Sequence, residues 1–198
     1  SLGAVKIQFP WDRTGTHDDA SSCWVRVAQP WSGPGYGFQF IPRVGAEVLV
    51  AFVGGDPDRP VVVGCLPNTH STLPFALPDS ATQSGIRTRS SPGGEDYSEL
   101  AFVDARGSEA VRLRAARDHE EEVVRNQRAR VGGEQSVSVG ASRSVSVAGR
   151  DVLSVGGGRT ERVVGEDTRT VVGRRRDTVE ANAERAVHGD EIGQIHGT

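Results

Sequence analysis

Hydrophobic residues recur every eight positions over the C-terminal part of the chain, and the phase never breaks. We call the repeated positions the valine column: Val123, Val131, Val139, Val147, Val155, Val163, Val171, Val179, Val187 and Ile195. Because eight is even and strand side chains alternate with period two, every member would lie on the same face of a strand. A helix cannot use this spacing, since eight residues at 100° each leave successive valines off a common line. The pattern therefore predicts β-structure in eight-residue repeats, which we call octads.

Residues two places before each column position share that face and change character along the chain. The early octads have Ala129, Val137, Val145 and Leu153 there, whereas the later ones have Glu161, Arg169, Asp177, Arg185 and Gly193. If these charges face inward, acidic and basic layers must pair between octads or be hydrated, because unpaired buried charge is costly. If they lie near a corner and lean into solvent, such pairs contribute little. The sequence leaves both arrangements open.

The length of an extended octad indicates whether one chain or several chains build the repeated structure. Eight extended residues span roughly 26 Å, enough for one face of a prism. A single chain with about three octads per turn would leave gaps of roughly 14 Å between its own strands, where about 4.8 Å is needed for hydrogen bonding. Two further copies fill these gaps, and glycines suit the corners between faces. A flexible low-complexity tail would explain the glycine and arginine content but not the phase.

The first half alternates with period two in short runs that turn residues separate. The runs are AVKIQF, CWVRVAQ, EVLVAFV and PVVVGCL, with the rigid turn GGDPDRP between the last two. These short strands predict a small barrel or sandwich over residues 1–67. Proline and small polar residues predict an extended linker over 68–98. Two alternating runs around DARGS predict a hairpin over 99–122, which leads into a needle of octads over 123–198.

Composition narrows the possible functions. Only 36% of the 198 residues are hydrophobic and 25 are glycine, so one large core is not expected. A net charge of −3 with interspersed signs gives no footprint for nucleic acid or an anionic membrane. Cys23 and Cys65 are too few for a disulfide framework, and we expect free, buried thiols. The chain has no methionine, as expected of a fragment of a longer chain, and no signal segment or apolar run of membrane length.

Motifs for enzymatic chemistry are absent or weak. Lys6 is the only lysine and lies in no phosphate-binding loop, and neither G-x-S-x-G nor H-E-x-x-H occurs. The run Glu120–Glu122 could suggest paired carboxylates, but alternation sends neighbours to opposite faces, which favours a solvated run. His188 and His196 lie one octad apart, so three chains could present histidine rings to a metal. Their parity points outward, and we expect no metal and no cofactor.

Aromatic residues gather in the first half of the chain: Trp11, Trp24, Trp31, Tyr36, Phe38 and Phe40. In a small barrel such a set could form a surface on which bases or sugars stack. The balanced charge around them favours packing in the barrel core and loops instead.

Several long phrases resemble a known family. FPWDR, SSCWVRV, GFQFIPRVGAEV, GDPDRP and TQSGIRTRSSPGG, followed by the octads, are similar to the valine-glycine repeat proteins (VgrG) of type VI secretion. That family resembles the central spike of contractile phage tails, and the resemblance covers essentially the whole chain. It implies an all-β fold, in which an OB-fold barrel is followed by an intertwined triple-stranded β-helix, as a homotrimer. The large N-terminal hub-like domain of the family has no counterpart in this sequence.

The resemblance also implies a function. It implies a spike of a contractile injection machine, assembled in the bacterial cytoplasm and then secreted or delivered into the target cell, whose membrane it contacts only mechanically. Its partners would be the tube protein and baseplate, through the N-terminal domain, and a tip-capping PAAR-type protein or effector at the C-terminal end. We expect no nucleic acid partner and no catalytic residue. The expected trimer core comprises Val131, Val137, Val139, Val145, Val147, Leu153, Val155, Val163, Val171, Val179, Val187 and Ile195.

Two alternatives stay open. The spike could belong to a phage tail or an extracellular contractile particle. The chain could also be the carrier part of a longer one that bears a toxic hydrolase domain, although the residues after Ile195 are too few to form such a domain.

Overall fold

The structure is a computed structural model that describes residues 2–184 and 186–188. Within these residues the regular structure is strand, apart from one short 3-10 helix, η1 (Val53–Gly55). The chain divides into two units, Ser1–Arg128 and Ala129–Thr198. Every strand of the described residues lies in the first unit.

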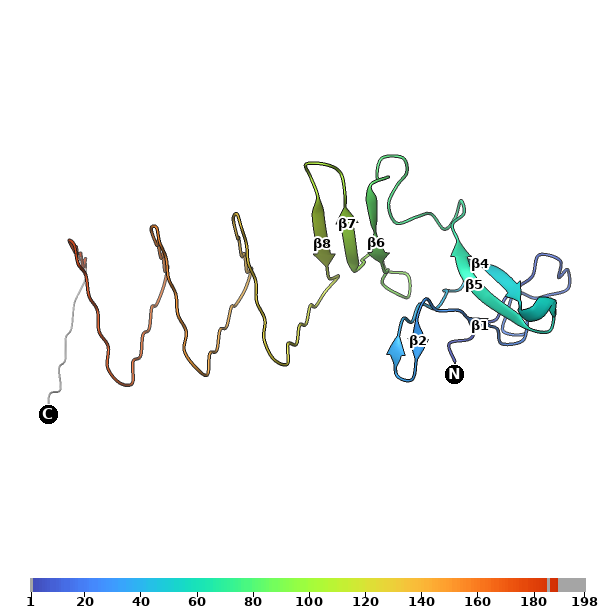
Figure 1. Cartoon of the computed structure of the whole chain (residues 1–198), viewed down its shortest axis with the longest axis horizontal. Helices are drawn as coiled ribbons and strands as arrows, with labels where there is room; N and C mark the ends of the chain where they lie inside the picture. Colours follow the sequence, from blue (N-terminus) through green and yellow to red (C-terminus); the bar gives the residue numbers. More distant parts are fainter. Residues whose placement is uncertain (1, 185, 189–198) are drawn as a thin grey trace. The chain divides into compact units, whose positions relative to one another are not determined.

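A three-stranded sheet forms the first part of the N-terminal unit. Strand β5 (Pro60–Leu66) is central, parallel to β1 (Arg26–Val27) and antiparallel to β4 (Glu47–Phe52). Figure 1 shows β4 and β5 as a long twisted pair. An antiparallel bridge between Val5 and Val25 adds the N-terminal segment to this sheet.

Alternate side chains build the core of this sheet. Along β4, half-buried and exposed residues alternate at every step, as the period-two pattern predicts. Ile7, Val25 and Val62 are buried at the centre, and Phe9 and Val50 pack against them from outside. The core is therefore small for the number of residues in the unit.

A small hairpin follows β1. Its strands are β2 (Ser32–Gly33) and β3 (Tyr36–Gly37), and they are antiparallel. Glycine is required at Gly37 because φ is 130° and an added Cβ would lie 2.5 Å from the carbonyl oxygen of Trp31.

The expected core role of the aromatic residues is wrong for the single chain. The six rings named above are between 45% and 69% exposed. Pairs of them pack on each other in and beside the small hairpin. Trp31 and Tyr36 of β3 have ring centroids 5.3 Å apart, and Phe38 and Phe40 have centroids 5.8 Å apart. The physical reason is size, since a core of three aliphatic residues cannot cover rings that each offer 150–250 Å².

A second three-stranded sheet forms the rest of this unit. It consists of β6 (Gln83–Arg87), β7 (Glu99–Val103) and β8 (Ala110–Arg114), antiparallel and in that order. The strands β7 and β8 form a hairpin around residues 104–109. Strand β6 lies within the segment expected to be an extended linker. Its sequence alternates only weakly, so the pattern does not reveal the strand, which forms because β6 pairs along its whole length with β7.

The C-terminal unit is a coil of straight segments and regular bends. The bends fall directly after each described member of the valine column, at 124–125, 132–133, 140–141, 148–149, 156–157, 164–165, 172–173, 180–181 and 188. The glycines Gly165 and Gly173 lie at two of these bends with φ of 131° and 130°, as expected for corners. Figure 1 shows the segments winding as an open coil whose successive turns lie apart.

Both cysteines are free, but they are exposed and not buried as expected. Cys65 lies in the second half of β5, where the strand continues beyond its buried residue Val62. The small extent of the core explains the difference.

Candidate functional site

In the octads that the structure describes, the backbone has no partner within its own chain. In residues 117–184 and 186–188 there is no strand and no backbone–backbone hydrogen bond. Each extended residue therefore presents its N–H and C=O groups like the edge of a sheet. Such a long unpaired edge is a template for pairing with other chains, because backbone polar groups in native proteins are almost always paired.

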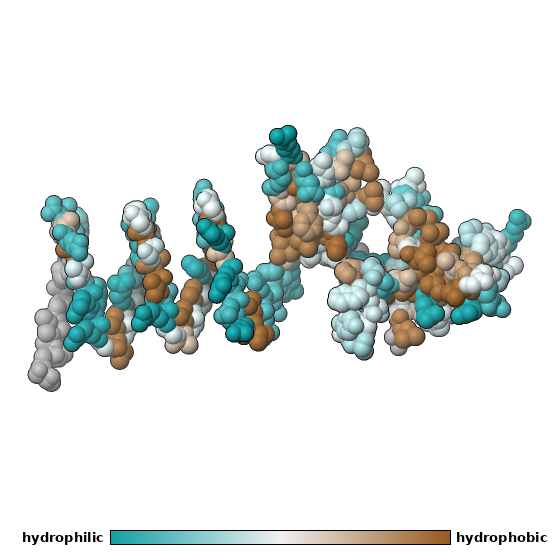
Figure 2. Space-filling model, in the orientation of Figure 1, coloured by the Kyte–Doolittle hydropathy of each residue, from teal (hydrophilic) through white to brown (hydrophobic). Residues whose placement is uncertain are grey.

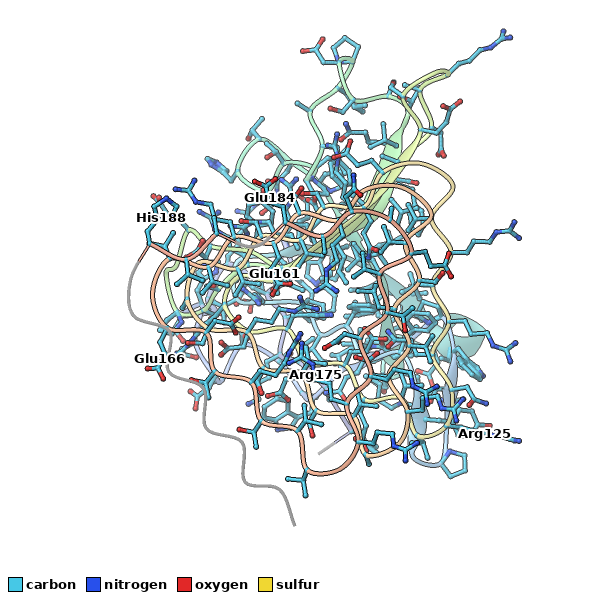
Figure 3. The ribbon with its side chains drawn as sticks, turned by 90° about the vertical axis from the view of Figure 1, so that its left-hand side faces the viewer. Arg125, Glu161, Glu166, Arg175, Glu184 and His188 are labelled. Atoms are coloured by element: carbon cyan, nitrogen blue, oxygen red, sulfur yellow. The ribbon has the colours of Figure 1, made fainter. Side chains whose placement is uncertain are left out.

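The valine column lies on the less exposed face of this coil. Its consecutive members from Val139 to Val171 are 47–50% exposed, whereas Val164 and Val172, which follow the column, are 86% and 98% exposed. Figure 3 shows Glu161 and Arg175, which have odd numbers like the column, inside the coil. Glu166 and His188, which have even numbers, lie outside it, and so does Arg125, which lies at the bend 124–125. Between the bends of the described residues, the face that carries the valine column therefore points toward the interior of the coil.

The residues of the expected trimer core are all exposed in the single chain, as far as the structure describes them. Those two places before the column are more exposed than the column itself, with 68% for Val137, 66% for Val145 and 67% for Leu153. Ile195 lies outside the described residues. Successive octads lie on different sides of the coil, and its turns lie apart, so the described members of the valine column form no core within the chain (Figure 1).

Charged residues on the same face form pairs along the extended chain. The guanidinium Nη2 of Arg159 lies 2.9 Å from Oε2 of Glu161, and Nε of Arg175 lies 2.7 Å from Oδ2 of Asp177. Both acidic residues therefore have an arginine within 4 Å, but the partner comes from the same octad and not from the next one. All four side chains are more than half exposed, so these pairs contribute little in the isolated chain.

The sheet of β6, β7 and β8 also exposes a hydrophobic face. It consists of Ile86, Leu100, Phe102, Val111 and Leu113, and cross-strand register places these side by side. Figure 2 shows hydrophobic residues exposed over this sheet. The opposite face has the buried residues Ala101 and Val103.

The total surface measures how incomplete the single chain is. Its accessible area is 19147 Å². A folded monomer of 21.1 kDa would expose about 9,000 Å². The chain therefore exposes about twice the surface of a monomer that folds by itself, as expected of a chain that buries part of its surface against other chains.

Groups suited to catalysis or metal binding do not gather in the part of the chain that the structure describes. There, no three histidine, cysteine, aspartate or glutamate residues lie close enough to hold a metal ion. Hydrogen bonds from the backbone of Thr14 and the side chain of Gln8 lower the pKa of Asp12, which is a local effect of its turn. Among residues 2–184 and 186–188, no helix has the length and apolar character to span a bilayer.

Two sequence families match the chain. The bacteriophage T4 gp5 C-terminal trimerisation domain matches residues 84–195, and the type VI secretion system and phage-baseplate injector OB domain matches residues 1–66. The expected all-β fold, an OB domain followed by a β-helix, is confirmed by these matches and by the strand content.

Curated proteins with similar sequences are also named as VgrG proteins. The type VI secretion system spike proteins VgrG4b and VgrG5 of Pseudomonas aeruginosa are 49% and 48% identical over 67% of this chain. The actin cross-linking toxin VgrG1 of Vibrio cholerae is 47% identical over 59% of it. These alignments cover 16%, 17% and 10% of the relatives, so the chain spans less than a fifth of their length. Because the trimerisation domain matches more than half of the chain and VgrG4b matches two thirds of it, the chain belongs to the VgrG family of spike proteins.

Proposed function

We propose that this chain forms the shaft of a trimeric spike in a contractile injection machine of the type VI class. The observation that carries the proposal is the unpaired backbone of the octads, together with an accessible surface about twice that of a folded monomer. A trimer of intertwined strands would pair that backbone and leave no long lateral edge. Such a shaft is stiff and narrow, so it transmits axial force from sheath contraction to a target membrane.

Threefold symmetry explains how three coils fit together. With about three octads per turn, a coil rises by one strand spacing, about 4.8 Å, for each octad and each third of a turn. Rotation by a third of a turn therefore places an octad of one chain directly above the preceding octad of its neighbour. Equivalent positions of successive octads then lie side by side in a parallel sheet, in three different chains.

The valine column forms the core of this trimer. Three copies of Val139, Val147 or Val155 would meet in each layer and bury surface that is half exposed in the single chain. The same role extends to the members from Val163 to Val187 and to Val137, Val145 and Leu153, and to Ile195 outside the described residues. The proposed domains are the barrel over 1–67, the linker over 68–98, the hairpin over 99–122 and the needle over 123–198. Within the linker, residues 83–87 form β6 and pair with the hairpin strand β7.

The purified chain should be a trimer in solution. In the described octads, the backbone and the valine column have no partners within one chain. A folded monomeric coil would therefore leave both exposed to water. Light scattering coupled to size exclusion should give three times the chain mass of 21.1 kDa. A stable monomer with undiminished β-structure would overturn the proposed assembly.

We also propose that this chain has no enzymatic activity. The relatives VgrG4b and VgrG5 are named as spike proteins. The role of a spike is mechanical, and we assign the same role to this chain. Hydrolase assays on peptidoglycan, phospholipid and nucleic acid should show no turnover above buffer. Reproducible turnover that follows the trimer peak through chromatography would contradict this proposal.

A second candidate function is that of a carrier. The VgrG1 toxin of Vibrio cholerae combines a region similar to this chain with about nine tenths of further length, and its name assigns it actin cross-linking. In this reading the chain delivers a toxic domain attached to it. The tube protein and baseplate, a PAAR-type tip protein or effector, and delivery into a target cell are part of the proposed function in either case. The full-length sequence discriminates between the two candidates.

A further inference from the structure

Two columns of charge run parallel to the valine column at odd-numbered positions like its own, and Figure 3 shows two of their members, Glu161 and Arg175, inside the coil. The first, four places before the column, comprises Arg143, Asp151, Arg159, Asp167 and Arg175; the second, two places before it, comprises Glu161, Arg169 and Asp177. We call these residues the charge ladder. The sign reverses at every step of both columns, and every member is exposed in the single chain.

The two columns also have opposite signs within the three octads that carry a charge in both. Arg159 precedes Glu161, Asp167 precedes Arg169, and Arg175 precedes Asp177. The first and last of these pairs make contact along the strand, at 2.9 and 2.7 Å. The charges therefore alternate in two directions, along each octad and from one octad to the next.

Stacking of three chains would turn this pattern into contacts between chains. Equivalent positions of successive octads lie about 4.8 Å apart in a parallel sheet, and successive octads on one face come from different chains. Asp167 of one chain then lies between Arg159 and Arg175 of its two neighbours. Arg169 lies between Glu161 and Asp177 in the same way, so every neighbour across the sheet has the opposite sign.

We propose that the charge ladder is the surface by which the three chains select their register, and that its partner is a second and third copy of this chain. This proposal rests on the trimeric spike described above. The valine column cannot select the register by itself, because it presents the same residue at almost every step and a slip of one octad leaves valine against valine. The ladder does select it, because only an odd offset in octads pairs opposite charges.

Charge complementarity makes the wrong registers unfavourable. With an offset of zero or two octads, Arg159 would face a second copy of itself or Arg175, and Asp167 would face a second copy of itself or Asp151. Like charges directly opposite on neighbouring strands are destabilising. Because arginine has a planar fork of donors, one side chain can bridge carboxylates on both sides of it in the correct register.

An exchange within one octad tests the ladder while preserving composition. The double variant Asp167→Arg with Arg169→Asp keeps the net charge and keeps an oppositely charged pair along the strand. It places the introduced arginine between Arg159 and Arg175, and the introduced aspartate between Glu161 and Asp177. We expect the melting temperature of the trimer to fall by about 5 °C or more, since the like-charge contacts recur in all three chains.

Two further variants complete the experiment. The control Arg162→Glu reverses a charge on the outer face, where the neighbouring octads have Ser154 and Thr170, and should shift the melting temperature by about 1 °C or less. The restoring variant reverses the sign of every charge in both columns, including Arg185, which continues the second column in the sequence. It should melt within about 2 °C of the unmodified chain, because every contact across the sheet is again between opposite charges.

The outcomes separate this proposal from the proposed function. If the unmodified chain is a trimer and the exchange melts like Arg162→Glu, the ladder does not select the register and the spike proposal stands. If the restoring variant melts as low as the exchange, the sign pattern between chains is irrelevant and the proposal is wrong. If the unmodified chain is a monomer by light scattering, the spike proposal fails and the ladder proposal fails with it.

Discussion

The substitution Val155→Asp should abolish the trimer at micromolar concentration and remove the cooperative melting of the needle. Three copies of the new carboxylate would meet in one layer of the core, where valine is proposed to exclude water. Burial of a charge without a partner costs several kcal/mol, and three like charges in one layer repel each other as well. The effect should therefore lie far beyond the roughly 0.5 kcal/mol of an ordinary surface substitution. Light scattering gives the mass, and circular dichroism gives the melting profile.

Val152→Asp is the matched control for this change. Val152 lies three residues earlier in the same octad, has the opposite parity and is 73% exposed, compared with 48% for Val155. Its carboxylate should lie in solvent and leave the mass of the trimer unchanged. If both variants remain trimers with the melting temperature of the unmodified chain, Val155 does not lie in a core. If Val152→Asp is the more damaging of the two, the two faces have been assigned the wrong way round.

The octads show how far a periodic sequence can predict a fold. Period eight, an even number, predicts that one face is kept, and the structure repeats its bends with the same period, directly after each described column residue. The eight-residue spacing of the bends agrees with the sequence because it depends on the geometry of an extended backbone, which a single chain adopts without its partners. The sequence leaves open whether the charged residues at 161 and 177 pair with arginine or lean into solvent. In the single chain both have an arginine partner from the same octad, and both side chains are more than half exposed.

In the N-terminal unit, sequence patterns predict the strands and the buried residues less completely. Alternation predicts β4 and β5 well, because one face of each packs on Val62 and its neighbours. Strand β6 is not predicted, since its ladder with β7 depends on a partner distant in sequence and not on its own pattern. Burial of the aromatic rings and of Cys23 and Cys65 is not predicted correctly either. Burial of these residues would require the core of a complete barrel, and the core of this chain is smaller.

A pair of cysteines one octad apart should convert the needle into a covalent trimer. Ser146 and Ser154 are equivalent positions of successive octads, both exposed and both on the outer parity. Within one chain they lie on different faces of the coil, too far apart to join. Between neighbouring chains the stacking places their Cα atoms about 4.8 Å apart, which is within the range of a disulfide. Ser146→Cys with Ser154→Cys should therefore link each chain to both of its neighbours.

The readout is the mass under denaturing, non-reducing conditions. Three such bonds close a ring of three chains, so most of the oxidised protein should migrate at three times the chain mass and return to one chain on reduction. Cys23 and Cys65 are free and exposed, so the experiment uses a background in which both are serine.

The matched control, Ser138→Cys with Ser154→Cys, lies on the same face but has a spacing of two octads. In the proposed register its Cα atoms lie about 9.6 Å apart with a strand between them, beyond the roughly 7 Å limit of a disulfide. Covalent trimer from the control, with none from Ser146→Cys and Ser154→Cys, would mean that neighbouring chains are offset by two octads, and that the stacking from which the core and the charge ladder were derived is wrong.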